Sequence, residues 1–248
     1  MPRPSTLRIL GIDLASDPKR TAACVLDWSG AVASLRELLV RVDDETAVAL
    51  AKDADVVAID APLGWPVAFG AAIAAHQRRE AWPVSSVREL SYRQTDLFVR
   101  DATGLWPLSV STDRIGIVAF RAARLLALLR PGATAARDGS SGIVEVYPAA
   151  ALRRWGLPFR QYKGADGTPV RRSIVDGLSA IAPIALDGFR EAIVASDDAL
   201  DALVAALVGV AKHEELVEPL PEGAVEVAGI EGWIWLPTGA PLGRTGLD

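Results

Sequence analysis

The stretch LRILGIDLAS, residues 7–16, is an apolar run with β-branched side chains and polar or turn-forming flanks. Such a run is typical of a buried β-strand, which we expect to end near Asp13. Two further strand-like segments follow, residues 20–30 and 31–42, with a Ser-Gly turn between them. The pattern predicts an antiparallel meander of three strands.

A helix and a second buried strand come next along the chain. Residues 43–54 begin with acids and have Lys52 near their end, a distribution that suits the helix dipole. Residues 55–66, DVVAIDAPLGWP, contain a short apolar run that ends at Asp60 and is stopped by Pro and Gly. Because a helix feeds this strand, parallel pairing with the first strand is favoured.

The remaining elements complete an α/β fold. Residues 63–112 are rich in Pro, Trp, Arg and Ser and predict an insertion of short helices and loops. A fifth strand is expected over residues 143–148, and a final strand or hairpin over residues 224–237. Helices are predicted over residues 113–129, 149–156 and 170–181, and from Ser196 onward. The sequence thus predicts a single domain over residues 1–248, with a central mixed five-stranded sheet flanked by helices and the insertion after the fourth strand.

Composition narrows the class of protein. The chain has 248 residues, half of them hydrophobic, and Cys24 is its only cysteine, so no internal disulfide can form. No apolar run approaches the length of about 18 residues that suggests a membrane span, and the first residues lack the apolar segment of a signal peptide. These features predict a soluble cytoplasmic protein without a membrane partner.

The charge is acidic overall but unevenly distributed. A net charge of -5 argues mildly against a nucleic-acid partner. Residues 153–172, however, form a basic strip opposed only by Asp166. The strip is either a solvated helix face or a surface that holds phosphates. Its basic residues are Arg153, Arg154, Arg160, Lys163, Arg171 and Arg172.

Several common motifs for phosphate binding, nucleophilic catalysis and zinc binding are absent from the sequence. The sequence contains no phosphate-binding loop G-x-x-x-x-G-K-[ST], no G-x-G-x-x-G after a strand and no G-x-S-x-G. His76 and His213 are the only histidines, and neither has neighbours at metal-ligand spacing, which excludes a Cys/His zinc site. The candidates for chemistry that remain are carboxylates.

Two carboxylates occupy equivalent places on two predicted strands. Asp13 follows the apolar ILGI and Asp60 follows the apolar VVAI. Ligands of open α/β sheets bind outside the carboxyl ends of the strands. If the strands are neighbours, the two carboxylates lie close together and repel each other unless a cation sits between them. Alternatively, each side chain holds a local turn.

Further acids lie on the late helix SDDALDALVAAL, residues 196–207. Asp201 is the only charged residue between Ala199 and Ala211, and it follows Asp198 by three positions on one helix face. Oxygen ligands at this spacing suit Mg²⁺ or Mn²⁺. Glu145, inside the predicted fifth strand, either faces solvent at a sheet edge or is buried at a cost.

The order of elements and the positions of these acids resemble the ribonuclease H-like superfamily. The late helix looks like the last catalytic helix of its Holliday-junction resolvase branch. The chain as a whole resembles domain-of-unknown-function family 429, whose members are described as predicted nucleases. The resemblance rests on the blocks GIDLAS, IDAPLGWP, YRQTD, VEVYPAAALRRWG, DALDALVAAL and EGWIWLP. It implies that Asp13, Asp60, Asp198 and Asp201 fall on metal-ligand positions, although the superfamily commonly has Glu where this chain has Asp60.

The main hypothesis is a Mg²⁺- or Mn²⁺-dependent nuclease that hydrolyses phosphodiester bonds by a two-metal-ion mechanism. Its catalytic residues would be Asp13, Asp60, Asp198, Asp201 and Glu145. Nucleic acid would be held by Arg93, Arg153, Arg154, Lys163, Arg171 and Arg172, and the assembly could be a homodimer. The alternative is a small-molecule phosphate enzyme or a non-catalytic regulatory or binding protein. ATPases that share this core need glycine-rich phosphate turns, which DLASDPKR after the first strand does not supply.

Overall fold

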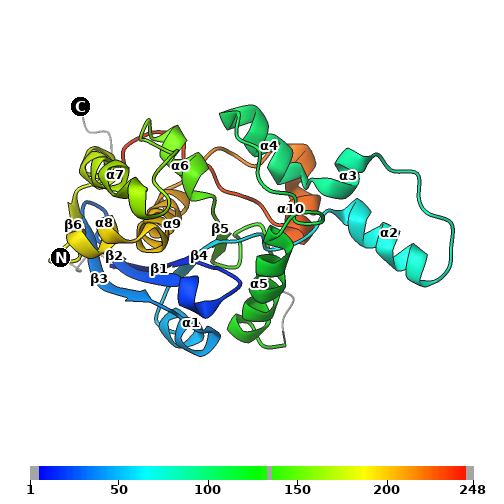
Figure 1. Cartoon of the computed structure of the whole chain (residues 1–248), viewed down its shortest axis with the longest axis horizontal. Helices are drawn as coiled ribbons and strands as arrows, with labels where there is room; N and C mark the ends of the chain where they lie inside the picture. The colour runs from blue at the N-terminus through cyan, green and yellow to red at the C-terminus, as the bar shows by residue number, and fades with distance from the viewer. Residues whose placement is uncertain (1–5, 133–135, 244–248) are drawn as a thin grey trace. The chain divides into compact units, whose positions relative to one another are not determined.

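The computed structural model describes residues 6–132 and 136–243. The chain divides into two compact units. The sheet unit comprises Met1–Asp60, Val146–Glu218 and Trp235–Asp248, and the helical unit comprises Ala61–Glu145 and Pro219–Ile234. Figure 1 labels the elements of both units. The predicted insertion at residues 63–112 therefore belongs to a larger unit that also includes a segment near the end of the chain.

The first four strands have the predicted pairing. β1 (Leu7–Asp13), β2 (Ala22–Trp28) and β3 (Ala33–Val40) form the antiparallel meander. Helix α1 (Asp44–Ala51) then leads to β4 (Val56–Asp60), which pairs in parallel with β1. Asp43 caps α1 by accepting a hydrogen bond from the Thr46 N–H. The meander and the parallel crossover are thus confirmed.

The sheet has six strands rather than the predicted five, in the order β5-β4-β1-β2-β3-β6. The additional strand is β6 (Ile184–Ala185), which pairs in parallel with β3. Two residues are too few to carry an alternating pattern, so no pattern in the sequence indicates this strand. β5 (Ile143–Glu145) matches the predicted fifth strand, although it ends at Glu145. The α/β class with a mixed sheet flanked by helices is confirmed.

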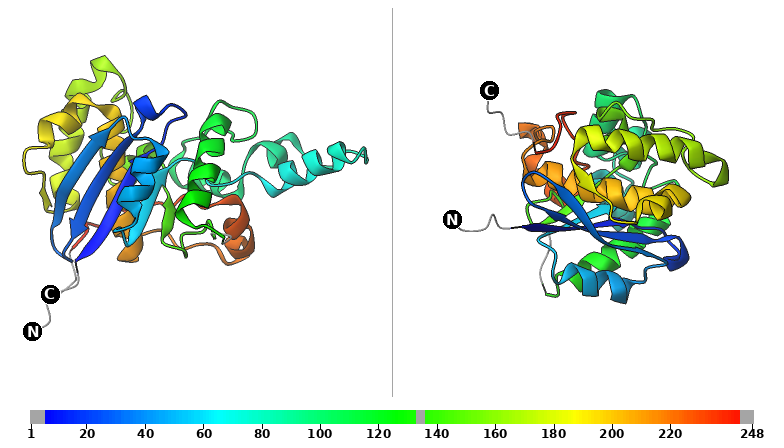
Figure 2. Two further views of the ribbon diagram at one scale, coloured as in Figure 1. Left: turned by 90° about the horizontal axis from the view of Figure 1, so that it is seen from below. Right: turned by 90° about the vertical axis from the view of Figure 1, so that its left-hand side faces the viewer.

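Helix α9 (Asp197–His213) forms the centre of the sheet unit. It packs on β1, β2 and β4, and its residues from Ala199 to Ala211 are buried. Figure 2 shows α9 on one face of the sheet and α1 on the other. Gly11 of β1 permits the close contact, because a Cβ atom there would lie 2.1 Å from the Ala202 carbonyl oxygen.

Shorter elements complete the sheet unit. They are the 3-10 turns η1 (Pro18–Arg20) and η2 (Ala165–Gly167) and the helices α6 (Pro148–Arg154), α7 (Thr168–Ile181) and α8 (Arg190–Ala195). Ser196 ends α8 and caps α9, since its hydroxyl accepts a hydrogen bond from the Ala199 N–H. The start of α9 is therefore fixed by a local side chain.

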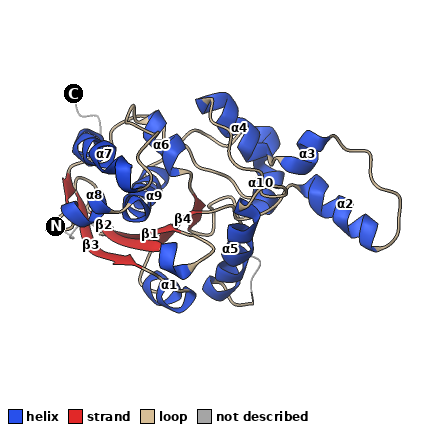
Figure 3. Cartoon of the chain, in the orientation of Figure 1, coloured by secondary structure: helices blue, strands red, loops and turns tan. Residues whose placement is uncertain are grey.

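The helical unit contains short helices and connecting loops, apart from β5 (Figure 3). Its helices are α2 (Val67–Gln77), α3 (Val87–Ser91), α4 (Gln94–Thr103), α5 (Ile115–Leu129) and α10 (Val225–Glu231), with the 3-10 turn η3 (Glu222–Ala224) before α10. No helix in the described ranges has both the length and the apolarity needed to cross a membrane.

The prediction of a strand or hairpin over residues 224–237 was wrong. Half of the segment is helix α10, and the isolated bridges Glu145–Ile234 and Val217–Pro237 follow it. The helical conformation places Ala228 and Glu231 on one buried face, three residues apart. The Glu231 carboxylate then accepts hydrogen bonds from the N–H groups of Val67 and Gln94. Hydrogen bonds to α2 and α4, which are distant in the sequence, thus support a helix where a strand or hairpin was predicted.

Candidate metal centre

Three carboxylates of the sheet unit converge at one point. Asp13 and Asp60 are directly paired at the ends of β1 and β4, and Asp201 approaches from the second turn of α9. One carboxylate oxygen from each residue lies within 4.8 Å of the other two. We call Asp13, Asp60 and Asp201 the acidic triad. Such a set of oxygen ligands could hold a divalent cation.

Asp201 is the most enclosed member of the triad, with no exposed side-chain surface. Its Oδ1 accepts a hydrogen bond of 3.0 Å from the Tyr162 hydroxyl, and its Oδ2 is paired with the Lys163 Nζ. These two partners are adjacent in the loop between α6 and α7. A buried charge is tolerated only when it is paired and hydrogen-bonded, and Tyr162 and Lys163 provide both interactions.

The electrostatics of the triad reflect crowding of like charges. Burial raises the pKa of Asp13 well above its usual range, and the negative charges of Asp60 and Asp201 raise it further. Burial also raises the pKa of Asp201, although Lys163 and Tyr162 oppose that shift. One ammonium group therefore faces three carboxylates that are costly to ionise together.

Lys163 interacts with all three acids. Burial lowers the pKa of the Lys163 ammonium, but the charges of Asp201, Asp13 and Asp60 outweigh this effect and raise the pKa above its ordinary value. Tyr147, which follows β5, also lies near the site, because burial and then the charge of Asp60 raise the pKa of its hydroxyl. No pattern in the sequence singles out Tyr147 or Tyr162.

Arg171 organises the loop that carries Tyr162 and Lys163. Its buried guanidinium donates hydrogen bonds to the carbonyl oxygens of Tyr162 and Gly164, at 2.6 and 2.7 Å, on either side of Lys163. The same group donates to the carbonyl oxygens of Val194 and Ala195, just before α9. Arg171 thus ties the Lys163 loop to the start of the helix that carries Asp201, and its guanidinium is used inside the protein rather than held open to a phosphate.

The other acids at the start of α9 have separate partners. Asp198 forms an ion pair of 3.3 Å with Arg20, and its charge makes a smaller contribution to the raised pKa of Asp13. Asp197 accepts a 3.3 Å hydrogen bond from the Gly164 N–H and so helps to dock the loop. Asp198, predicted as a metal ligand, therefore lies near the triad but is paired with Arg20.

Glu145 and Arg93, which were predicted as catalytic and substrate-binding residues, form a buried network in the helical unit. Arg93 pairs with Glu145 at 2.7 Å and with Asp96 at 2.9 Å, and the Leu63 N–H donates to Glu145 at 3.0 Å. Burial raises the pKa of Glu145 despite the opposing charge of Arg93. Both groups are buried and bonded to each other, so this arrangement gives neither of them access to a phosphodiester.

The cations of the basic strip at residues 153–172 have separate partners, except Arg153 and Arg160, which share one aromatic ring. Arg154 pairs with Glu218, and Arg172 pairs with Glu191 at 3.1 Å. Arg153 and Arg160 lie over the Phe159 ring, with their guanidinium carbons 5.1 and 5.3 Å from its centroid. Of the predicted substrate-binding residues, Lys163 is the one that contacts the acidic triad.

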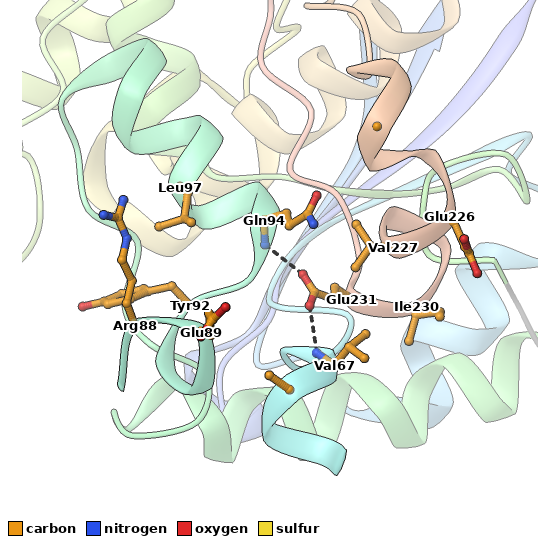
Figure 4. Close-up of a pocket in the computed structure, with 12 residues that line it drawn as sticks. Val67, Arg88, Glu89, Tyr92, Gln94, Leu97, Glu226, Val227, Ile230 and Glu231 are labelled. Carbon is orange, nitrogen blue, oxygen red and sulfur yellow. Dashed lines mark hydrogen bonds between the residues drawn. The ribbon is translucent and has the colours of Figure 1, made fainter. Parts of the chain in front are cut away.

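The helical unit contains a separate pocket of about 560 Å³. Figure 4 shows Glu231 at its wall, hydrogen-bonded to the backbone N–H groups of Val67 and Gln94. Glu89, another lining residue, accepts hydrogen bonds from the N–H and hydroxyl of Ser86 in a capping box. These carboxylates stabilise helix ends, whereas the triad combines several acids at one point. The triad is therefore the stronger candidate for chemistry.

Comparison with known proteins gives a family but no activity. No curated protein matches the chain significantly, and no solved structure does. One family model matches residues 11–226, a span that includes every member of the acidic triad together with Tyr162, Lys163 and Arg171. This chain therefore belongs to the family described as "Protein of unknown function (DUF429)".

Proposed function

We propose that this protein is a Mg²⁺- or Mn²⁺-dependent phosphodiesterase that acts on nucleic acid, with Asp13, Asp60 and Asp201 as metal ligands. The observation that carries the proposal is the convergence of these side chains, with ligand oxygens within 4.8 Å of one another. Carboxylate oxygens are the ligands that these ions prefer. Burial and then the charges of Asp60 and Asp201 raise the pKa of Asp13, and a bound divalent cation would offset the repulsion among these carboxylates.

The topology of the sheet supports placement in the ribonuclease H-like superfamily. The order β1-β2-β3-α1-β4, followed by α5 and β5, is the order that suggested this superfamily from the sequence. Asp13 and Asp60 lie on the first and fourth strands, and Asp201 lies on a late helix. Fold alone does not define activity, so the proposal depends on the triad.

Each residue near the triad has a distinct task in this proposal. A Mg²⁺ or Mn²⁺ ion held there would lower the pKa of a water molecule and stabilise negative charge on phosphoryl oxygens. Asp13 and Asp60 offer ligand oxygens from a rigid pair of strands. Tyr162 orients Asp201 through its hydrogen bond to Oδ1, and Arg171 fixes the loop that carries Tyr162. The protein thus presents ligands that are aligned before an ion arrives.

A small phosphate-containing substrate is the second candidate, because the cations expected to hold a nucleic-acid backbone are largely used within the protein. Arg171 is buried, Arg172 pairs with Glu191, and Arg154 pairs with Glu218. Long polyanions are normally held by many exposed Lys and Arg side chains. A compact substrate would need only the metal site and a few neighbouring groups.

A cleavage assay distinguishes these candidates. The purified protein is incubated with Mg²⁺ or Mn²⁺ and with single-stranded, duplex and branched DNA and RNA, and in parallel with bis(p-nitrophenyl) phosphate. We expect metal-dependent cleavage of at least one nucleic acid, which Asp13→Asn abolishes and Asp53→Asn, at an exposed position, leaves intact. Cleavage of the small diester alone would favour the second candidate. Failure to cleave any substrate with either metal would contradict both.

A further inference from the structure

We propose that Lys163 is a displaceable counter-ion of the acidic triad: its ammonium neutralises the carboxylates in the metal-free protein and leaves them when a divalent cation binds. The inference rests on the proposed metal function and adds a regulatory property to that site. It predicts that the protein binds metal more weakly with Lys163 than without it.

The first support is the position of the ammonium. Lys163 Nζ is paired with Asp201 Oδ2, while Asp201 Oδ1 accepts a hydrogen bond from the Tyr162 hydroxyl. Both oxygens of Asp201 are therefore engaged. A metal ion that takes Oδ2 as a ligand would lie beside the ammonium already paired there, and binding through Oδ1 would crowd the Tyr162 hydroxyl that donates to it.

The second support is the charge around the ammonium. The negative charges of Asp13 and Asp60, in addition to that of Asp201, stabilise the Lys163 ammonium. The cation therefore interacts with the whole triad rather than with one acid. A divalent ion bound to the same carboxylates would repel a neighbouring ammonium, since like charges at short range disfavour each other. Metal and ammonium therefore exclude each other from the triad.

The third support is the freedom of the Lys163 side chain to leave. Its side chain is 53 % exposed, whereas that of Asp201 is 0 % exposed. The backbone on either side is held by Arg171 through the carbonyls of Tyr162 and Gly164. The flexible four-carbon stem of lysine can thus carry the ammonium into solvent while the loop and Tyr162 stay in place.

The main test is the affinity for Mn²⁺, measured by isothermal titration calorimetry on the chain of residues 1–248. We compare the wild type with Lys163→Met and with Lys52→Met, which removes the charge of an exposed lysine after α1. We expect Lys163→Met to bind Mn²⁺ about 10-fold more tightly, within the range typical of coupled binding events, and Lys52→Met to match the wild type. Lys163→Gln serves as a second variant if Lys163→Met does not fold. Asp13→Asn should weaken binding in every background, because it removes a ligand from the same site.

A second readout follows the ammonium itself. Amine acylation of the wild type, mapped by mass spectrometry, should increase at Lys163 when Mg²⁺ is added and stay constant at Lys52. If the wild type and Lys163→Met bind Mn²⁺ equally tightly, or if folded Lys163→Met binds it more weakly, the counter-ion proposal is overturned while the metal site stands. If no folded variant binds Mn²⁺, the proposed function fails together with this inference.

Discussion

Asp13 and Asp60 are direct partners in the parallel pairing of β1 and β4. Because side chains alternate between the two faces of a sheet, paired residues of neighbouring strands project to the same side. A slip of one residue between the strands would send one carboxylate to the opposite face. The register of two adjacent strands therefore creates two thirds of the acidic triad, and α9 adds Asp201 to it.

The crowding of the triad predicts an unusual effect of Asp13→Asn. Burial and the charges of Asp60 and Asp201 raise the pKa of Asp13, so its ionised form destabilises the folded protein at neutral pH, and a neutral side chain of similar size should remove both costs. We expect a higher melting temperature than the wild type in EDTA at pH 7.5, measured by differential scanning fluorimetry.

Millimolar Mn²⁺ should change the melting temperature of the wild type more than that of Asp13→Asn. It should raise the melting temperature of the wild type, because an ion that binds only the folded state stabilises that state by mass action. Asp13→Asn should respond little, and Asp53→Asn should respond like the wild type. An unchanged melting temperature of the wild type in Mn²⁺ would count against a metal site in the triad.

Removal of one hydroxyl tests how Asp201 is oriented. Tyr162→Phe deletes the hydrogen bond to Asp201 Oδ1 and keeps the ring. We expect the free energy of unfolding to fall by about 1–2 kcal/mol, and Mn²⁺ affinity to fall by about 10-fold, as is usual for residues that orient a metal ligand. Chemical denaturation and calorimetry measure the two effects. Full metal affinity in the folded variant would show that Asp201 needs no such orientation.

Adjacent arginines of α7 should differ sharply in their effect on stability. Arg171→Met removes the donor from the buried carbonyl oxygens of Val194 and Tyr162, and each such acceptor costs about 1–3 kcal/mol, so we expect a loss of roughly 3 kcal/mol. Arg172→Met removes an exposed ion pair with Glu191 and should leave the free energy of unfolding almost unchanged. Urea denaturation of both variants makes the comparison. Equal losses would contradict the organising role of Arg171.

The sequence could predict those features that depend on local pattern. Continuous apolar runs identified β1 and β4, and the helix between them implied the parallel pairing that joins Asp13 to Asp60. Asp201 was identifiable because it is the only charged residue between Ala199 and Ala211, a stretch of helix that is otherwise apolar. Each of these inferences needs only neighbouring residues and the geometry of one element.

Features that depend on distant main-chain groups left no signal in the sequence. The buried guanidinium of Arg171 binds carbonyl oxygens, and every residue type supplies a carbonyl oxygen. Arg93 is neutralised by Glu145, which lies 52 residues further along the chain. A basic strip therefore looked like a phosphate-binding surface, because composition does not reveal which cations are already paired inside the fold.

Asp27 should make stability depend on acid pH. The Arg8 side chain lowers the pKa of this carboxyl by hydrogen bonding, and Arg36 adds to the effect. A lowered pKa in the folded state gives stability that is present above the unfolded pKa of about 3.9 and is lost as the pH falls through the folded value. We expect Asp27→Asn to be less stable than the wild type from pH 7 to about 5.

The difference between these two proteins should shrink below about pH 4, as Asp27 of the wild type becomes protonated. Urea denaturation across this range measures it, with Asp53→Asn as a control that should show no such trend. A constant difference from pH 7 to 3 would mean that Asn disrupts packing rather than removing a charge interaction.

The contact between β1 and α9 predicts that Gly11→Ala displaces the helix that carries Asp201. A Cβ atom at position 11 would lie 2.1 Å from the Ala202 carbonyl oxygen and 2.6 Å from the Ala206 nitrogen, and backbone atoms of a packed helix cannot yield cheaply. We expect a loss of about 3 kcal/mol in the free energy of unfolding, at the upper end for overpacking, and weaker Mn²⁺ binding.

Gly209→Ala is the comparison on the helix side, where the nearest atom is the Ile9 Cγ2 at 2.8 Å, a side-chain methyl rather than a backbone atom. Its overpacking should be largely offset by the gain of about 1 kcal/mol from alanine in a helix. If Gly11→Ala is as stable as Gly209→Ala and binds Mn²⁺ normally, the close packing of α9 on β1 does not determine the position of Asp201.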